Sequence, residues 1–335
     1  MKTGQNKSKW TEAQMADLEL SKLVSHYAHS NRAEGKSPRT IEWYSQILGE
    51  YLSFLNAQDG NATLSKLDLD SVREFVVQEQ NRGLSPYSVS GKVRSLKAFS
   101  SWLFREGYIS GNILTNCKPP RVPTLIIQPL SGTEIALLVG KNDPMTVAGC
   151  RDIAILTLML DTGIRLSELC GLRLDDVNVD GGYCKVLGKG RKERLLPFGA
   201  LTQKMLWRWL IHFRPAPFAI KDDFFFLTIH GNYMMPNAVK LLMVRWGKRA
   251  GVPRLHAHLC RHTFATNYLL HQCGDVFRLQ LILGHTSLGM VNRYVHLAST
   301  QAMVNGKIIS PVDQLGIQKL KRFGADRQTH CSGKY

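Results

Sequence analysis

Four prolines fall within a short, weakly charged stretch and divide this chain into two dissimilar parts. They are Pro119, Pro120, Pro123 and Pro129. Proline fixes φ and removes an amide donor, so this stretch is expected to be extended and of limited flexibility. We therefore predict a linker over 111–130 that separates a first domain, residues 1–110, from a second domain, residues 131–298.

The first part has the pattern of a helical bundle. Apolar residues recur at helical spacing, and Ser-Pro or Asp, which favour helix N-termini, precedes three of the segments. We predict four helices, roughly at 11–30, 38–57, 69–82 and 86–106. The last two carry basic residues on their polar faces, which are candidate DNA contacts: Arg82, Lys92, Arg94 and Lys97. A solvated charged face on an ordinary bundle explains each lysine equally well.

The second part is also mostly helical, with one interruption. It begins near Ser131, where SGTEIALLVG has the cap and acidic first turn of a helix. Between 175 and 198, glycines separate short strand-like runs, which indicates a small β-hairpin or sheet. The predicted fold class is therefore mainly α, with two domains and a small β element in the second.

The charge balance favours a polyanionic partner. The chain of 335 residues has 43 Lys and Arg against 26 Asp and Glu, a net charge of +17, and most of the excess follows residue 121. Such a field attracts polyanions, and binding that neutralises phosphates weakens with salt. A basic protein without a nucleic-acid partner remains the alternative. No apolar run approaches the roughly twenty residues of a membrane span, so we expect a cytoplasmic protein with no membrane contact.

The cysteines do not indicate a disulfide framework or a metal site. Seven cysteines are scattered without a CxxC pair, which is typical of reduced, buried thiols. In a strand, His256, His258, Cys260 and His262 would line one face and could hold zinc. Apolar neighbours instead favour a helix, on which alternate residues lie about 200° apart. We predict no metal and no cofactor.

The segment from His258 to Tyr294 carries side chains suited to phosphoryl transfer. His258 and Arg261 are three residues apart, so on a helix they share a face and could grip one phosphate together. Leu283-Gly284-His285 is typical of a helix that ends in a turn and offers a second imidazole. Tyr294 follows nine residues later and offers a phenol.

These motifs resemble those of the tyrosine recombinase family, which includes phage integrases and Xer-type recombinases. The family's HxxR box, LGH turn and YxH motif correspond to 258–261, 283–285 and 294–296. Upstream, TGIRLSEL at 162–169 resembles the first arginine box, and GKGRKER at 188–194 resembles the hairpin that carries the catalytic lysine. The resemblance covers about residues 20 to 297.

The resemblance implies a SAM-like helical core-binding domain followed by a mixed, mostly helical catalytic domain. It also implies six catalytic residues: Arg165, Lys189, His258, Arg261, His285 and Tyr294. Lys192 and Arg194, on the same hairpin, are expected to contact backbone phosphate. The expected partners are double-stranded DNA at a specific site and further copies of the chain, as a dimer on a core site and a tetramer in the synapse.

The chemistry of phosphodiester cleavage needs these residue types. Arg165 and Arg261 would neutralise the nonbridging oxygens as charge builds, because a guanidinium donates two hydrogen bonds and stays protonated. Tyr294, with an ordinary pKa near 10, needs a base, for which His258 is the candidate. Lys189 would protonate the departing 5′-oxygen. The 3′-phosphotyrosine link conserves the bond energy, so no ATP is needed.

Several alternatives stay open. Arg165 could form a buried pair with Glu168, a role compatible with catalysis, and His262 is expected to pack in the core. A type IB topoisomerase and a non-catalytic DNA-binding regulator are the rival functions. The biological role could be integration or excision of a mobile element, or resolution of replicon dimers. The tail, 299–335, is a candidate protomer-exchange segment, through an apolar stripe at Leu315, Ile317, Leu320 and Phe323, or simply a frayed basic end.

Overall fold

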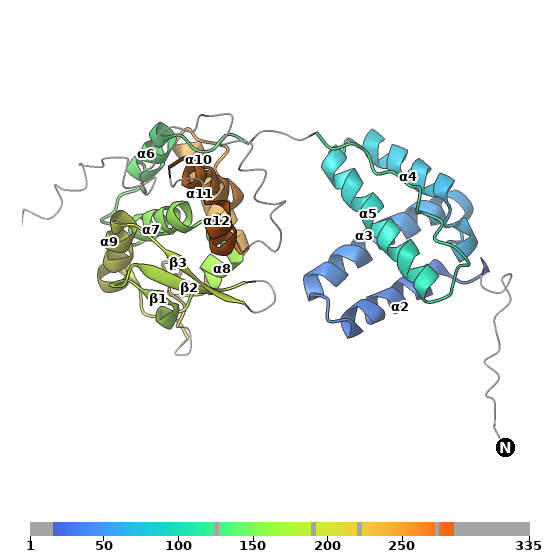
Figure 1. Cartoon of the computed structure of the whole chain (residues 1–335), viewed down its shortest axis with the longest axis horizontal. Helices are drawn as coiled ribbons and strands as arrows, with labels where there is room; N and C mark the ends of the chain where they lie inside the picture. The colour runs from blue at the N-terminus through green and yellow to red at the C-terminus, as the bar shows by residue number, and fades with distance from the viewer. Residues whose placement is uncertain (1–15, 124–126, 189–191, 220–222, 272–274, 285–335) are drawn as a thin grey trace, which may run out of the picture. The chain divides into compact units, whose positions relative to one another are not determined.

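The computed structural model describes residues 16–123, 127–188, 192–219, 223–271 and 275–284. The chain divides into two compact units, Met1–Leu125 and Ile126–Tyr335 (Figure 1). The predicted tail at 299–335 lies outside the described residues. Each unit has its own hydrophobic core, and each is described by itself below.

The first unit is a bundle of helices around an aromatic core. The helices are α2 (Leu20–Ala33), α3 (Pro38–Asp59), α4 (Leu69–Asn81) and α5 (Pro86–Arg105), with a 3₁₀ turn at Leu64–Lys66. Trp102 of α5 is fully buried, and its ring lies 5.1 Å from the ring of Tyr27 and 5.9 Å from that of Phe99. Large buried aromatic rings of this kind dominate the energy of a small core.

The helix starts follow the local signals of the sequence. The Ser37 and Ser85 side chains accept hydrogen bonds from the amides of Thr40 and Ser88, each with proline at the next position, and Asp68 caps α4. The predictions for these three helices are confirmed. Of the predicted first helix over 11–30, residues 17–19 are not helical, and the prediction is confirmed from the observed helix start at Leu20. Its amide donates to the carbonyl of Ala62 at 2.9 Å, beside a bridge between Glu19 and Thr63.

The beginning of the expected linker packs against the first unit. Leu114 and Cys117 are buried in its core. The Lys97 ammonium donates to the carbonyls of Thr115 and Cys117, at 2.9 and 2.8 Å. The first residues of 111–130 are therefore held by the helical bundle, whereas the predicted domain boundaries themselves stay a prediction.

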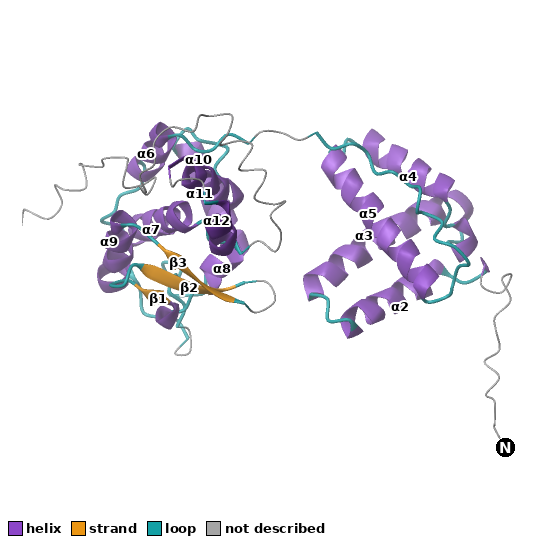
Figure 2. Ribbon diagram, viewed as in Figure 1, coloured by secondary structure: helices purple, strands orange, loops and turns teal. Residues whose placement is uncertain are grey.

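The second unit combines helices with a small antiparallel sheet (Figure 2). Its helices are α6 (Gly132–Gly140), α7 (Val147–Thr162), α8 (Leu166–Gly171), α9 (Ala200–Arg208), α10 (Pro236–Arg249), α11 (Ala257–His271) and α12 (Val276–Leu283). A 3₁₀ turn at Leu174–Asp176 and a π-helix at Trp209–Phe213 complete the helical segments. Helix α7 is buried from Gly149 to its end at Thr162 and packs against α9 and α11. It is the central element on which the unit is built.

The sheet has three strands in the order β1 (Val177–Asn178), β2 (Tyr183–Leu187) and β3 (Glu193–Pro197). The expected hairpin is thus confirmed. Val186 pairs with Arg194 across β2 and β3, on the face where Cys184, Val186 and Leu196 are buried. The opposite face is open, with Leu187 and Leu195 each 57% exposed. Alternation along β3 therefore directs Arg194 toward the interior of the unit.

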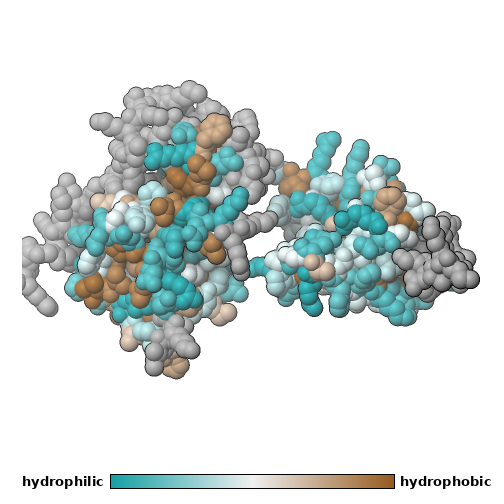
Figure 3. Space-filling model, turned by 60° about the horizontal axis from the view of Figure 1, so that its bottom comes forward, coloured by the Kyte–Doolittle hydropathy of each residue, from teal (hydrophilic) through white to brown (hydrophobic). Residues whose placement is uncertain are grey.

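The two units differ in the polarity of their surfaces. In Figure 3 hydrophilic residues cover most of the visible face of the first unit, whereas apolar patches are more extensive on the second. No helix in the described ranges has both the length and the apolar content to cross a membrane.

The five described cysteines are free and buried, as predicted, whereas Cys273 and Cys331 lie outside the described residues.

Candidate active site

The site is built where α7 ends and α8 begins. Gly163 closes α7 with φ of 59°, and a Cβ at this position would lie 2.5 Å from Cδ1 of Phe264. Only glycine fits this left-handed conformation and close approach. The turn places Arg165 at the N-terminal boundary of α8, beside the carbonyl end of α7.

Arg165 has a carboxylate and a backbone carbonyl as partners. Its Nη1 donates to Glu168 Oε1 at 2.9 Å, and its Nη2 donates to the carbonyl of Gly284, also at 2.9 Å. The pair with Glu168 that the sequence left open is therefore present. Two of the five N–H groups of a guanidinium are used in this way, and the side chain is 32% exposed. Arg165 keeps donors and solvent access for an incoming anion.

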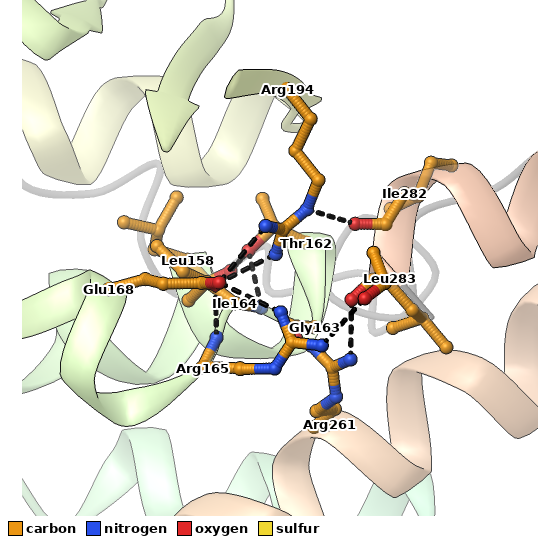
Figure 4. Close-up of polar contacts among 11 residues, drawn as sticks. Leu158, Thr162, Gly163, Ile164, Arg165, Glu168, Arg194, Arg261, Ile282 and Leu283 are labelled. Carbon is orange, nitrogen blue, oxygen red and sulfur yellow. Dashed lines mark hydrogen bonds and ion pairs between the residues drawn. The ribbon is translucent and has the colours of Figure 1, made fainter. Parts of the chain in front are cut away.

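Arg261 reaches the same place from α11. It is buried, and its Nη1 and Nη2 donate to the carbonyls of Gly163 and Leu283, at 2.6 and 2.7 Å (Figure 4). These carbonyls lie at the C-terminal ends of α7 and α12, where the helix dipoles favour positive charge. The two arginines predicted to clamp a phosphate are thus brought together by two helix ends.

His258 lies one turn before Arg261 on α11 and is exposed. Partial desolvation of the ring, followed by the charge of Arg261, lowers the pKa of His258 below its ordinary value. The imidazole is therefore neutral near pH 7 and able to accept a proton. His262 is buried, and its Nε2 lies 2.6 Å from the carbonyl of Ile127, the core role that was expected.

The zinc alternative depended on a strand at 256–262. This segment instead enters α11 at Ala257, so the four side chains diverge around a helix.

Three of the six predicted catalytic residues, Lys189, His285 and Tyr294, lie outside the described residues. The residues just before two of them are described. Gly188 follows β2 and its amide donates to the carbonyl of Lys192 at 2.8 Å. Gly284 ends α12 with φ of 62°, as the sequence predicted for this turn.

The structure does not support DNA contact for two of the predicted basic residues of the first unit. The ammonium of Lys92 is paired with Glu50 at 2.5 Å and with Glu79, and its side chain is only 12% exposed. Lys97 is bonded to the carbonyls of Thr115 and Cys117, as described above. Both ammonium groups are directed inward because acceptors within the protein bind them: carboxylates of other helices bind Lys92, and backbone carbonyls of 111–117 bind Lys97.

The remaining predicted contacts differ in exposure. Arg94, Lys192 and Arg82 are exposed, although Arg82 also pairs with Glu79 at 2.6 Å. Arg94 lies over the ring of Tyr87, 6.0 Å from its centroid. These three residues are the ones that remain available to a DNA backbone.

Arg194 is likewise engaged within the protein, and its expected phosphate contact stays a prediction. Its side chain is 12% exposed and donates to both oxygens of Glu168, at 3.0 and 2.8 Å, and to the carbonyl of Ile282, at 2.7 Å. A guanidinium with these partners is directed into the protein and not toward a phosphate. The inward direction of Arg194 could have been predicted from the sequence, since inward and outward positions alternate along β3. That Glu168 is the acceptor shared by Arg194 and Arg165 is seen only in the folded structure.

The described part of the site presents two arginine side chains at the ends of α7 and α12 and an imidazole one turn before Arg261, and these residue types suit the binding of a phosphodiester. The phage integrase family matches residues 130–301, and the N-terminal SAM-like domain of phage integrases matches residues 24–107. The chain belongs to the phage integrase family, as its motifs predicted.

Curated relatives agree with this assignment, and solved structures share the fold. The tyrosine recombinase XerC of Xanthomonas campestris pv. campestris is 31% identical over 283 residues, which cover 84% of this chain and 86% of the relative. XerH, solved bound to a palindromic difH substrate, aligns with a TM-score of 0.66 and 20% identity over 87% of this chain and 82% of XerH. The Tn1549 transposon integrase, solved with transposon right end DNA, aligns with a TM-score of 0.65 and 20% identity over 83% of this chain and 97% of the integrase chain. The predicted fold class is confirmed.

Proposed function

We propose that this chain is a site-specific DNA recombinase that cleaves and rejoins DNA through a 3′-phosphotyrosine intermediate. The observation that carries the proposal is the convergence of Arg165 and Arg261 on the adjoining ends of α7 and α12. Each arrives from a different helix, and Arg165 remains partly exposed. Family membership and the likeness to recombinases solved with DNA support the same conclusion.

The proposed reaction begins with the scissile phosphate held by the two arginines. Their donors neutralise the nonbridging oxygens, and His285 adds a further donor. His258 takes the proton of the Tyr294 hydroxyl, whose oxygen attacks phosphorus. The 5′-oxygen leaves with a proton from Lys189, and a 3′-phosphotyrosine remains. Attack by the 5′-hydroxyl of a second strand reverses these steps and releases the tyrosine.

Strand exchange sets the partners. The substrate is duplex DNA carrying a specific site, and exchange between two duplexes needs four active sites, hence a dimer on each core site and a tetramer in the synapse. The solved lambda integrase fragment is a dimer bound to a core site, which supports this stoichiometry. Exposed Arg94, Arg82 and Lys192 are proposed to contact backbone phosphate. Access to DNA favours the cytoplasm, and integration or excision of a mobile element, or resolution of replicon dimers, is the proposed role.

The first test concerns the nucleophile. Half-sites enriched from random duplexes by the full chain are nicked to make suicide substrates that trap the covalent adduct. Tyr294→Phe removes only a hydroxyl, so it should bind the half-site as the unmodified chain does and form no adduct. An undiminished adduct would identify a different nucleophile and contradict the mechanism.

A second assay separates the rival functions. A supercoiled plasmid carrying two full sites gives recombinant circles with a recombinase, relaxed circles of unchanged sequence with a type IB topoisomerase, and a bound but unaltered plasmid with a regulator. We expect recombinant circles. Relaxation without recombinants, or binding alone, would contradict the proposal.

A further inference from the structure

Arg194 is the one described side chain that joins the first arginine box, the hairpin and the end of α12. It lies on β3, on the inward face of the sheet, at 12% exposure. Its Nη1 and Nη2 bind the two oxygens of Glu168, and its Nε binds the carbonyl of Ile282 (Figure 4). All three nitrogens of the guanidinium are thus engaged, and the two-pronged contact with a carboxylate fixes its orientation.

Two glycines make room for this guanidinium. A Cβ at Gly284 would lie 3.2 Å from Nη1 of Arg194, and one at Gly188 would lie 3.1 Å from the same atom. Both distances are tighter than ordinary contacts of a side chain. Gly188 immediately precedes Lys189, and Gly284 immediately precedes His285. The Arg194 guanidinium therefore packs against the backbone from which two proposed catalytic residues extend.

Glu168 extends the connection to Arg165. Its side chain is 5% exposed, and it accepts from Arg194, from the guanidinium of Arg165 and from the amide of Arg165. Burial would raise the pKa of this carboxyl, but the hydrogen bonds from Arg194 and Arg165 outweigh burial, and the pKa is lowered. The carboxylate stays ionised and holds Arg165 through two of its groups.

We infer that Arg194 is a positioning residue for DNA cleavage, which fixes the β2–β3 hairpin, Arg165 and the end of α12 relative to one another and does not bind a DNA phosphate. The inference rests on the proposed function, because it assigns those elements to one reaction. It replaces the phosphate contact that the sequence predicted for Arg194. Misplacement of reacting groups by about 1 Å can cost on the order of 100-fold in rate.

The test compares Arg194→Lys with Arg173→Gln. Lysine keeps a cation beside Glu168, so the fold is retained, but an ammonium has no planar fork to bind Glu168 and Ile282 together. Arg173 pairs with Asp223 at the surface of the same unit, with its side chain 52% exposed, and is outside the site. Single-turnover cleavage of the suicide substrate is measured at saturating enzyme, well below each melting temperature. We expect Arg194→Lys to be roughly 10- to 100-fold slower and Arg173→Gln to be unchanged.

Two further measurements separate positioning from the alternatives. Half-site affinity is measured from low to high salt: a lost phosphate contact would reduce the slope of log K against log salt by about 0.9, whereas we expect the same slope and affinity. Cleavage is repeated with a 5′-bridging sulfur, whose departure as thiolate needs no proton. Because the hairpin carries the proposed acid, the deficit of Arg194→Lys should shrink on this substrate.

The contrary results distinguish a failure of the role of Arg194 from a failure of the proposed function. An unchanged cleavage rate, a reduced salt slope, or an equal deficit on the oxygen and sulfur substrates would overturn the role of Arg194. A loss of cleavage in Arg173→Gln of the same size would show a general effect of charge removal and would overturn it as well. Absence of any adduct with the unmodified chain would instead contradict the proposed function itself.

Discussion

Each unit has a buried glutamate side chain paired with cations, and the two clusters differ in the other acceptors that bind those cations. In the first unit Glu79, 1% exposed, binds Lys92 and Arg82, and Lys92 also binds Glu50. In the second unit Glu168, 5% exposed, binds Arg194 and Arg165. Burial would raise the pKa of both carboxyls, yet their hydrogen bonds to these cations lower it.

The difference lies in the remaining acceptors. Around Glu79 the buried cation is satisfied by carboxylates, so the cluster is close to neutral. Around Glu168 the arginines also donate to backbone carbonyls at the ends of α7 and α12, and Arg261 donates to two further carbonyls there. Positive charge is left over at the second cluster. We infer that the first cluster serves folding and the second serves the binding and reaction of an anion.

The largest effect is expected at Arg165. Arg165→Lys retains the charge but removes the planar fork, and loss of one donor to a transition-state oxyanion typically costs about 10²- to 10³-fold in rate. Glu168 keeps its bonds to Arg194, so the melting temperature should change little. Single-turnover cleavage and thermal unfolding check both expectations. A large drop in melting temperature without a slower rate would show that Arg165 stabilises the fold, as the Glu79 cluster does, and does not act in cleavage.

The opposite result is expected at Lys92. Lys92→Met leaves Glu79 buried with only the exposed Arg82, and breaking a buried pair costs about 3 kcal/mol or more. Urea unfolding of the full chain, with hydrogen exchange at the α4 and α5 amides, should show a loss confined to the first unit. The cleavage rate of bound protein should be retained. If Lys92→Met instead leaves stability unchanged and lowers the salt slope of DNA binding, Lys92 binds phosphate as the sequence first suggested.

A smaller effect concerns pH. A lowered pKa means that His258 loses its proton at a lower pH than an ordinary histidine, so the base form persists as the solution is acidified. The cleavage rate should stay level from pH 8 to about 6.5 and fall only below that. The pH profile of His258→Gln should lack this acidic limb. A limb centred above 6.5, or one retained in the variant, would assign the base to another residue.

Much of this arrangement was predictable from the sequence, because it depends on local signals. The caps at Ser37, Asp68 and Ser85 fix three helix starts, and Gly163 and Gly284 mark the ends of α7 and α12. The motif spacing also singled out Arg165 and Arg261, whose side chains meet at the ends of α7 and α12, and His258, one turn before Arg261. The catalytic roles of these three residues, like those of Lys189, His285 and Tyr294, stay predictions.

What the sequence did not predict depends on partners distant in the chain. Helix α2 begins at Leu20, whose amide donates to the carbonyl of Ala62. Lys92 lies on a polar helical face that periodicity assigns to solvent, but Glu50 and Glu79 from two other helices meet it there. Arg194 is 26 residues from Glu168 and 88 from Ile282. The contacts of Arg194 follow from the packing of β3 against α7 and α12.

The most direct test of the contrast is a parallel substitution of the two glutamates. Glu79→Gln and Glu168→Gln remove the same charge from buried positions, and each full-length variant is measured for unfolding free energy by urea and for single-turnover cleavage at saturating enzyme. The account predicts that Glu79→Gln lowers stability with a normal cleavage rate, whereas Glu168→Gln slows cleavage at least 10-fold, as expected when reacting groups are misplaced. If both variants lose stability and cleavage in the same proportion, the two clusters do not differ in role and the account is contradicted.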